Sequence, residues 1–174
     1  MELTEKKVLF CDLDGTLIET KSGKVFPKGV WDVEIKLDVF EKITKLFPKL
    51  KAIFIVTNQA GIEKGYVNED TFRDKLKWVC ACLKDFTLSK NQKVKFIEGT
   101  YCDTNDYEDD WRKPNTGMLS YMLNIHPEFG KIQKEDIVML GDASGKLGQF
   151  SDSDLMTAKK FKIDYIDVED LLAM

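Results

Sequence analysis

The chain has 174 residues and a mass of 20.0 kDa, with 43% hydrophobic and 32% charged residues, which is typical of one globular domain. This composition excludes disordered, collagen-like and disulfide-scaffold proteins. Because the chain has 26 lysines and arginines but 30 aspartates and glutamates, its net charge is −4. Any contact with a polyanion must therefore rely on a local basic patch or a metal ion rather than on the overall charge.

The apolar runs and the first residues of the chain bear on where the protein works. Runs such as 52–56 are strand-sized and far shorter than the roughly 20 residues of a membrane span. Residues 1–7 are mixed polar and charged, unlike a signal peptide. We therefore expect a cytoplasmic or nuclear protein that is not secreted, with no membrane contact and with its four cysteines reduced. We also expect a monomer.

Short apolar runs alternate along the chain with longer stretches whose apolar residues recur at helical spacing. Strands are predicted at 7–11, 52–56, 94–97, 137–140 and 165–166, and helices at 34–47, 69–86, 114–125, 155–161 and 168–172. Asn68 is the predicted N-cap of the second helix, and Pro114 lies in the first turn of the third. Alternating strands and helices with continuously apolar strands favour an α/β fold, a mostly parallel sheet covered on both faces. Without an internal repeat or linker, residues 1–174 are expected to form a single domain.

Polar side chains follow four of the predicted strands. They are Asp12 and Asp14 after the first, Thr57 and Asn58 after the second, Lys113 after the third, and Asp142 after the fourth. In parallel sheets the functional groups gather where the strands end at their carboxyl side, so we expect these side chains to meet there.

The chemistry of these groups is that of phosphoryl transfer. Asp12 and Asp14 lie two apart on an extended chain and point the same way, so their carboxylates repel unless a cation separates them. Oxygen ligands of this kind suit Mg²⁺. Thr57 and Lys113 are suitable donors to a phosphoryl oxygen. With Asp12 as nucleophile, an aspartyl-phosphate would form, and Asp14 would protonate the leaving oxygen and then activate water.

Two other motifs are excluded by spacing. A calcium loop starting at Asp12 needs glycine at its sixth and glutamate at its twelfth position, where this chain has Leu17 and Gly23. The segment 141–146 is one residue too short for a nucleotide-binding phosphate loop, and Leu147 stands where that loop needs serine or threonine.

The segment Asp12-Leu13-Asp14-Gly15-Thr16-Leu17 resembles the first motif of the haloacid dehalogenase (HAD) phosphatases. The second, third and fourth motifs of that superfamily are matched by Thr57, Lys113 and Gly141-Asp142. Segments 20–29, 57–65, 112–118 and 141–145, with Phe150-Ser151 and Asp154, further resemble the polynucleotide 3′-phosphatase branch. This resemblance covers about residues 6–172.

The resemblance implies a HAD-type, Rossmann-like three-layer fold without a cap domain, with a short flap at about 18–30. It implies a role for each matching residue: Asp12 as nucleophile, Asp14 as acid and base, Thr57 and Asn58 as phosphate ligands, Lys113 as neutralising charge, and Asp154 as the auxiliary acid that orients Lys113. Mg²⁺ would be held by Asp12, the backbone carbonyl of Asp14, and Asp142.

The implied activity is Mg²⁺-dependent removal of the 3′-phosphate from polynucleotide ends, DNA above all, in nucleic-acid end repair. The kinase motif G-x-x-x-x-G-K-[ST] of larger family members is not found, so no 5′-phosphorylation is expected.

Two segments allow two interpretations each. Lys21, Lys24 and Lys28, with Phe26 among them, form either an ordinary solvated turn or a substrate flap on which Phe26 stacks against a base. The acidic segment 101–110 is either a solvent-exposed rim or a surface that repels duplex and favours single-stranded ends.

Two other functions compete with the polynucleotide phosphatase. A small-molecule HAD phosphatase acting on a sugar phosphate or on histidinol phosphate would share the arginine–lysine–proline segment 112–114. A binding module on an inactive HAD scaffold is disfavoured, because a scaffold has no need of so costly a cluster of charges.

Overall fold

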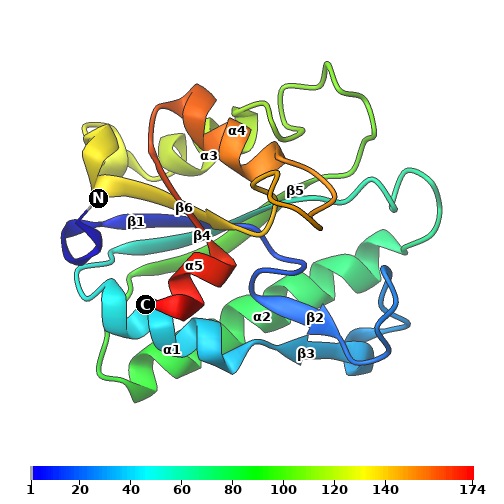
Figure 1. Cartoon of the computed structure of the whole chain (residues 1–174), viewed down its shortest axis with the longest axis horizontal. Coiled ribbons are helices and arrows are strands. Elements are labelled where there is room, and N and C mark those ends of the chain that lie inside the picture. The colour runs from blue at the N-terminus through cyan, green and yellow to red at the C-terminus, as the bar shows by residue number, and fades with distance from the viewer. Residues whose placement is uncertain (1) are drawn as a thin grey trace.

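Five parallel strands form the central sheet, in the order β5-β4-β1-β6-β7. The computed structural model describes residues 2–174 (Figure 1). The strands are β1 (Val8–Cys11), β4 (Ala52–Asn58), β5 (Phe96–Cys102), β6 (Ile137–Gly141) and β7 (Asp164–Asp167). The predicted α/β fold with a mostly parallel sheet is confirmed.

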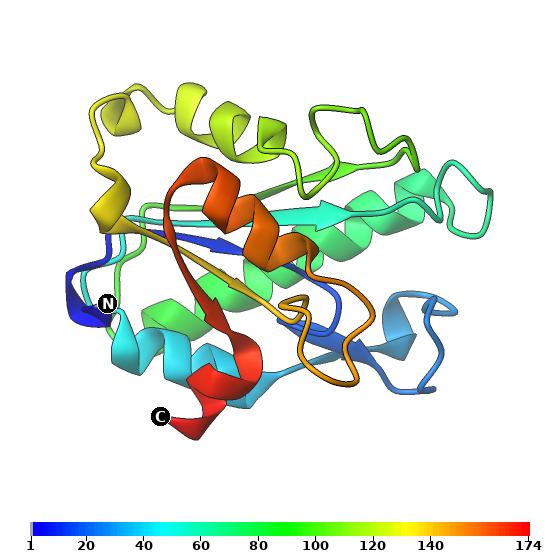
Figure 2. The same cartoon turned by 45° about the horizontal axis from the view of Figure 1, so that its top comes forward.

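Helices cover both faces of this sheet, which gives three layers (Figures 1 and 2). They are α1 (Leu37–Leu46), α2 (Glu69–Ser89), α3 (Gly117–Asn124), α4 (Ser153–Phe161) and α5 (Val168–Ala173). Helices α3 and α4 pack on one face, and α1, α2 and α5 on the other. Short 3-10 helices occur at Leu3–Glu5, Val30–Asp32, Pro127–Phe129 and Lys134–Asp136.

The central strands β1 and β6 are buried along their whole length. Successive side chains point to opposite faces, so Leu9 packs under α1, α2 and α5, whereas Phe10 packs under α3 and α4. A strand that is buried on both faces has no polar face, which is why these strands are recognisable as continuous apolar runs. Asn68 caps α2 as predicted, its side-chain oxygen accepting from the backbone N–H of Thr71 at 3.0 Å.

Two predicted helices are too long. The predicted helix 34–47 begins only at Leu37, because the residues before it form β3 (Val33–Ile35), antiparallel to β2 (Ile18–Thr20). The predicted helix 114–125 begins at Gly117 instead of Pro114. Residues 110–117 form a turn before this helix, in which the N–H of Gly117 donates to the carbonyl of Asp110 at 2.8 Å.

The predicted flap at 18–30 is the larger part of this β2–β3 hairpin, whose connecting loop spans 21–32. The loop is organised by Asp32, which is fully buried. Its carboxylate accepts from the backbone N–H and the hydroxyl of Ser22, at 2.8 and 2.7 Å, and from the N–H of Lys28 at 3.0 Å. The bond from Lys28, together with those from Ser22, lowers the pKa of Asp32.

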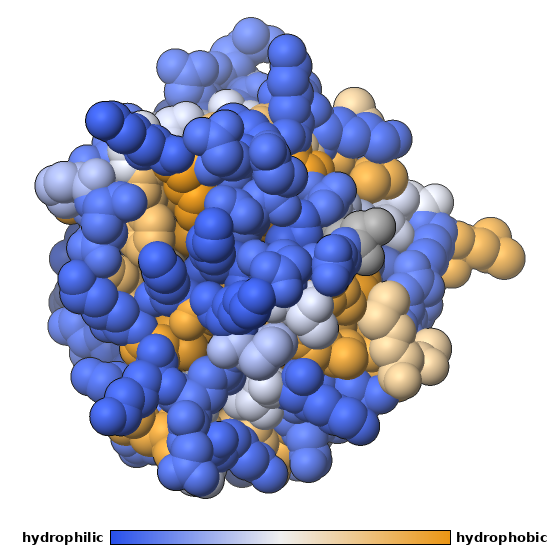
Figure 3. All heavy atoms as spheres, turned by 90° about the vertical axis from the view of Figure 1, so that its left-hand side faces the viewer, coloured by the Kyte–Doolittle hydropathy of each residue, from blue (hydrophilic) through white to orange (hydrophobic). Residues whose placement is uncertain are grey.

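The amino ends of the strands lie on the left of Figure 1. Hydrophilic side chains cover most of that face, with apolar ones scattered among them (Figure 3). Within residues 2–174, no helix combines the length and the apolar character needed to cross a membrane.

Candidate active site

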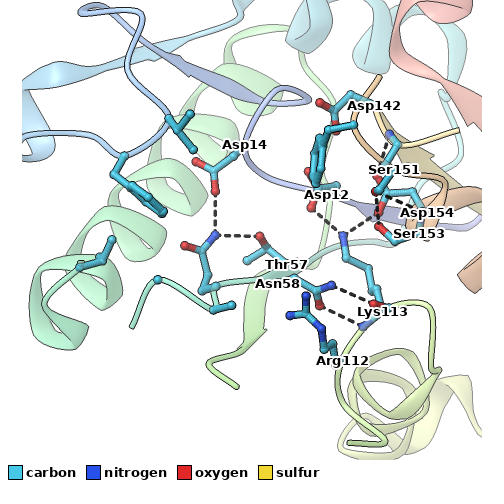
Figure 4. Close-up of a pocket in the computed structure, with 18 of the residues that line it drawn as sticks. Asp12, Asp14, Thr57, Asn58, Arg112, Lys113, Asp142, Ser151, Ser153 and Asp154 are labelled. Carbon is cyan, nitrogen blue, oxygen red and sulfur yellow. Dashed lines mark hydrogen bonds and ion pairs between the residues drawn. The ribbon is translucent and has the colours of Figure 1, made fainter. Parts of the chain in front are cut away.

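The loops that follow the strands line an open cleft of about 500 Å³ at the carboxyl edge of the sheet. The candidate residues Asp12, Asp14, Thr57, Asn58, Lys113, Asp142 and Asp154 all line it (Figure 4). These residues are scattered in sequence but come together because parallel strands end at the same edge.

Lys113 occupies the centre of the buried part of the cleft, between two carboxylates (Figure 4). Its Nζ donates to Asp12 Oδ1 at 2.6 Å and to Asp154 Oδ1 at 2.7 Å. Burial lowers the pKa of Lys113, but the two carboxylates outweigh burial and hold that pKa above its usual range. The ammonium is therefore charged and fixed in place.

Three carboxylates surround this single ammonium. Asp12, Asp142 and Asp154 each offer one oxygen, and these oxygens lie within 4.8 Å of one another. Burial raises the pKa of Asp12 to about 8, against the opposing charge of Lys113, and the pKa of Asp142 to about 6. The neighbouring carboxylate of Asp154 adds to the rise in both pKa values, so three carboxylates around one ammonium leave a surplus of negative charge. An all-oxygen donor set with such a surplus fits a hard divalent cation such as Mg²⁺.

The carboxylate cluster differs in one member from the expected metal ligands. Asp154, expected only to orient Lys113, joins Asp12 and Asp142. Its second oxygen accepts from the backbone N–H of Ala143 at 3.2 Å. The carboxylate of Asp14 points elsewhere, and the role of its backbone carbonyl as a metal ligand stays a prediction.

Two glycines allow the carboxylates to approach the strand ends this closely. Gly15 has a φ of +84°, and a Cβ there would collide with the carboxylate of Asp142. A Cβ at Gly141 would collide with the carboxylate of Asp154. Since only glycine lacks the Cβ, any other residue at either position would push a carboxylate out of the cluster.

Asn58 contacts Lys113 rather than presenting its whole side chain to the cleft. Its Nδ2 donates to the carbonyl of Lys113, and its Oδ1 accepts from the N–H of Lys113, both at 2.9 Å. The peptide that follows, Lys113–Pro114, is cis. Thus Asn58, expected as a phosphate ligand, has its amide engaged in fixing the backbone that carries the ammonium.

Asp14 and Thr57 are linked by a residue that the sequence did not single out. Gln59 Nε2 lies 2.7 Å from Asp14 Oδ2 and 2.9 Å from Thr57 Oγ1. The other oxygen of Asp14 pairs with Lys75 Nζ at 3.2 Å. The signal for Lys75 was its position within the apolar stripe of the helix predicted at 69–86, where a lysine is out of place.

The flap residues divide between the cleft and the solvent. Phe26 lines the cleft and packs against Tyr66, with ring centroids 5.5 Å apart. Lys21, Lys24 and Lys28 are exposed and lie outside the lining. The basic side chains that do line the cleft, besides the buried Lys75 and Lys113, are Lys64 and Arg112. Neither was predicted to contribute on its own.

The acidic segment 101–110 contributes only Tyr107 to the lining of the cleft. The Arg112 guanidinium lies over the Tyr107 ring, 4.9 Å from its centroid. The carboxylates of the segment therefore belong to the surroundings of the cleft, which favours the interpretation of the segment as a solvent-exposed rim.

Comparison with known proteins identifies the family of this chain. The family model of polynucleotide kinase 3 phosphatase matches residues 7–171. The chain belongs to this family. It is a HAD phosphatase, as the motifs predicted, and hence a phosphoric monoester hydrolase by family.

The relatives of this chain whose names give a substrate are named for different ones. An uncharacterized 20.8 kDa protein of Autographa californica nuclear polyhedrosis virus is 30% identical over 97% of this chain and 86% of its own length. The bifunctional polynucleotide phosphatase/kinase of Schizosaccharomyces pombe is 30% identical over 92% of this chain, which spans only 36% of that larger protein. A D-glycero-beta-D-manno-heptose-1,7-bisphosphate 7-phosphatase of Haemophilus ducreyi is 31% identical over 70% of this chain and 68% of its own length.

Solved structures confirm the HAD fold. The D,D-heptose 1,7-bisphosphate phosphatase of B. bronchiseptica, solved with magnesium and phosphate, aligns with a TM-score of 0.66 at 16% identity, over 91% of this chain and 78% of that one. A HAD-like phosphatase of Mesorhizobium loti aligns with a TM-score of 0.64 at 18% identity, over 97% of this chain and 85% of that one.

Proposed function

We propose that this phosphatase removes the 3′-phosphate from polynucleotide ends, DNA in the first instance, during nucleic-acid end repair. The observation that supports this substrate most directly is the family match, which runs from residue 7 to residue 171 and includes every candidate site residue. We infer that it works as a monomer in the cytoplasm or nucleus. All four cysteines are free, in keeping with a reducing compartment.

The proposed reaction has two steps. Asp12 attacks phosphorus, a bond forms between its carboxylate oxygen and phosphorus, and the bond from phosphorus to the 3′ oxygen breaks. Asp14 gives its proton to that oxygen, which leaves as the 3′-hydroxyl. Asp14 then takes a proton from water, which attacks phosphorus and releases Asp12 and inorganic phosphate.

The remaining groups hold the transferring phosphate. Thr57 Oγ1 is positioned to donate to a phosphoryl oxygen, since Gln59 already donates to that hydroxyl. The Lys113 ammonium lies beside Asp12, where it would neutralise the negative charge that develops on the phosphoryl group. Asp12, Asp142 and the backbone carbonyl of Asp14 would hold Mg²⁺, with the Asp154 carboxylate in the same cluster, and the ion would supply charge neutralisation at the phosphoryl group.

The openness of the cleft suits a polymeric substrate. In the described chain, only the β2–β3 hairpin is inserted between β1 and α1, in place of a cap domain. A strand end can reach Asp12, whereas an internal phosphodiester has a bulky second substituent that would meet the cleft walls.

A sugar-phosphate phosphatase is the second candidate, because heptose bisphosphate phosphatases also match this chain. A substrate panel decides between the two. We expect kcat/KM for a 3′-phosphorylated oligonucleotide to exceed that for heptose, hexose and histidinol phosphates by orders of magnitude in Mg²⁺, and activity to vanish with chelator. A preference of that size for a small phosphomonoester would refute the proposal.

Asp12→Asn tests the covalent route. Its amide is a far weaker nucleophile, so we expect phosphate release to be abolished while the circular dichroism spectrum stays that of the wild type. Asp136→Asn is the matched control, since Asp136 pairs with Lys7 away from the cleft. Substantial turnover by Asp12→Asn would rule out the aspartyl-phosphate.

A further inference from the structure

Lys75 is a buried lysine on the side of α2 that faces the core. Only 4% of the residue is exposed, and its Nζ lies 5.0 Å from the centroid of the Phe72 ring. An ammonium is costly to bury unless a charge compensates it. In residues 2–174, Asp14 is the carboxylate with which Lys75 forms an ion pair, at 3.2 Å.

Asp14 receives a second donor on its other oxygen. Gln59 Nε2 approaches Asp14 Oδ2 at 2.7 Å, while Lys75 approaches Oδ1. The two donors come from different parts of the fold, the loop after β4 and the first half of α2, whereas Asp14 itself follows β1. The carboxylate is thus fixed from two directions.

Such fixation matters because the Asp14 side chain is otherwise free to turn. It is 43% exposed, unlike that of Asp12, which is 11% exposed. A carboxylate has about four lone-pair positions, so two donors leave the others available for a proton exchanged with substrate or water. Holding an acid within hydrogen-bond reach of the leaving oxygen is the geometric condition for proton transfer.

We propose that Lys75 and Gln59 form a clamp that holds the Asp14 carboxylate within hydrogen-bond reach of the leaving oxygen. This inference rests on the proposed role of Asp14 as acid and base. Lys75 is a positioning residue in this scheme, because it acts on the reacting atoms only through Asp14. Gln59 has a second task, since it also orients the Thr57 hydroxyl.

The clamp has a consequence that a purely structural lysine would not have. Protonation of the leaving oxygen is essential for an alkoxide, a poor leaving group, and matters little for p-nitrophenolate, a good one. The ratio kcat/KM covers the steps up to departure of the leaving group. Loosening Asp14 should therefore lower kcat/KM for alkyl phosphates more than for aryl phosphates, whereas general damage to the fold lowers both equally.

The test compares Lys75→Met with Lys77→Met. Both residues lie on α2, but Lys77 is exposed and lines no part of the cleft. For Lys75→Met we expect kcat/KM for a 3′-phosphorylated oligothymidylate to fall about 10- to 100-fold further than kcat/KM for p-nitrophenyl phosphate. For Lys77→Met the ratio of the two should stay that of the wild type. Equal losses on both substrates, or no loss on either, would overturn the clamp.

Two further arms keep the test decisive. If Lys75→Met does not fold, as judged by its thermal melt, Lys75→Gln and Gln59→Leu undergo the same comparison. Gln59→Leu should show the same bias and an added loss on both substrates through Thr57, and an unbiased loss would again overturn the clamp. If the wild type does not hydrolyse the oligonucleotide, the proposed substrate is wrong, and glycerol 2-phosphate serves as the alkyl ester in the same comparison.

Discussion

At the scale of single residues, Lys113 has both its backbone and its side chain held by neighbours. Asn58 bonds to its N–H and its carbonyl, and Asp12 and Asp154 accept from its ammonium. The Lys113 and Asp154 side chains are 2% and 1% exposed. The lysine therefore has two tasks that separate measurements on one variant can report: it offsets buried carboxylate charge in the fold, and it neutralises the phosphoryl group in the proposed reaction.

Lys113→Met should remove both effects. We expect kcat to fall by at least about 10²–10³-fold, because a positioned donor is lost from the transition state. We expect the free energy of unfolding at pH 8 to fall by ~3–5 kcal/mol, because Asp12 and Asp154 are left buried and unpaired. Urea denaturation and steady-state kinetics measure the two effects. Lys159→Met, at an exposed position of α4, is the control; a Lys113→Met protein as stable as this control would mean that the carboxylates are compensated by something else.

The sequence could predict those site residues that come directly after an apolar strand, and could not predict those that depend on a tertiary contact. Asp12, Thr57 and Asp142 directly follow apolar strands, so topology alone placed them at one edge. Lys75 could not be assigned, because its partner lies 61 positions away and the contact exists only once α2 packs beneath the loop of Asp14. The role of Asn58 as a phosphate ligand came from the family resemblance, whereas its two bonds to the Lys113 backbone join residues 55 positions apart and exist only in the folded chain.

At the scale of elements, the β2–β3 hairpin depends on Asp32. Three hydrogen bonds converge on its carboxylate and shape the loop 21–32. The same loop brings Phe26 to the cleft wall against Tyr66. The geometry of the wall is therefore set by a residue that does not line the cleft itself.

Asp32→Ala should loosen this loop without removing a group from the cleft. We expect trypsin to cut within 21–32 faster than in the wild type, and KM for the oligonucleotide to rise by about 3- to 10-fold, since each lost hydrogen bond is worth ~1 kcal/mol. Limited proteolysis and kinetics on the oligonucleotide and on p-nitrophenyl phosphate provide the readouts. Glu34→Ala removes an exposed carboxylate from the same hairpin and should change neither. Unchanged proteolysis of Asp32→Ala would show that packing of Phe26 alone holds the loop.

The hairpin also shows where sequence reasoning about elements stops. The long helix α2 and the buried strands have strong periodicity over many residues, and their existence was predictable. The three residues of β3 precede a helix with compatible apolar spacing, and their pairing with β2 is a tertiary contact. A three-residue strand is too short for its period of two to stand out from the helical pattern that follows.

At the scale of the whole molecule, the negative net charge leaves polyanion binding to the few basic groups at the cleft. Lys64 lines the cleft, whereas Lys24 is exposed outside it. We expect Lys64→Ala to raise KM for the oligonucleotide by about 3- to 10-fold and to reduce the dependence of KM on salt, because one phosphate contact is lost. Lys24→Ala should stay within about twofold of the wild type on the same measure. A larger effect at Lys24 would show that the strand follows the lysines of the flap instead.

The last expectation concerns how pH and Mg²⁺ together set the stability of the fold. Burial raises the folded-state pKa of Asp12 to about 8 and that of Asp142 to about 6, from an ordinary value of 3.8. Between about pH 4 and 8, these two carboxylates therefore bind more protons in the metal-free folded protein than in the unfolded chain, and their contribution to stability falls as the pH rises. Mg²⁺ needs these carboxylates ionised, so it should stabilise the fold little at pH 5 and strongly at pH 8.

At a free Mg²⁺ concentration about a hundred times the dissociation constant, the gain in the free energy of unfolding is ~2.7 kcal/mol, or about 5–10 °C in Tm. Thermal melts in EDTA and in Mg²⁺ at pH 5, 6, 7 and 8 measure the gain, and Asp12→Asn combined with Asp142→Asn should abolish it. A gain that is the same at pH 5 and pH 8 would place the bound ion away from this cluster.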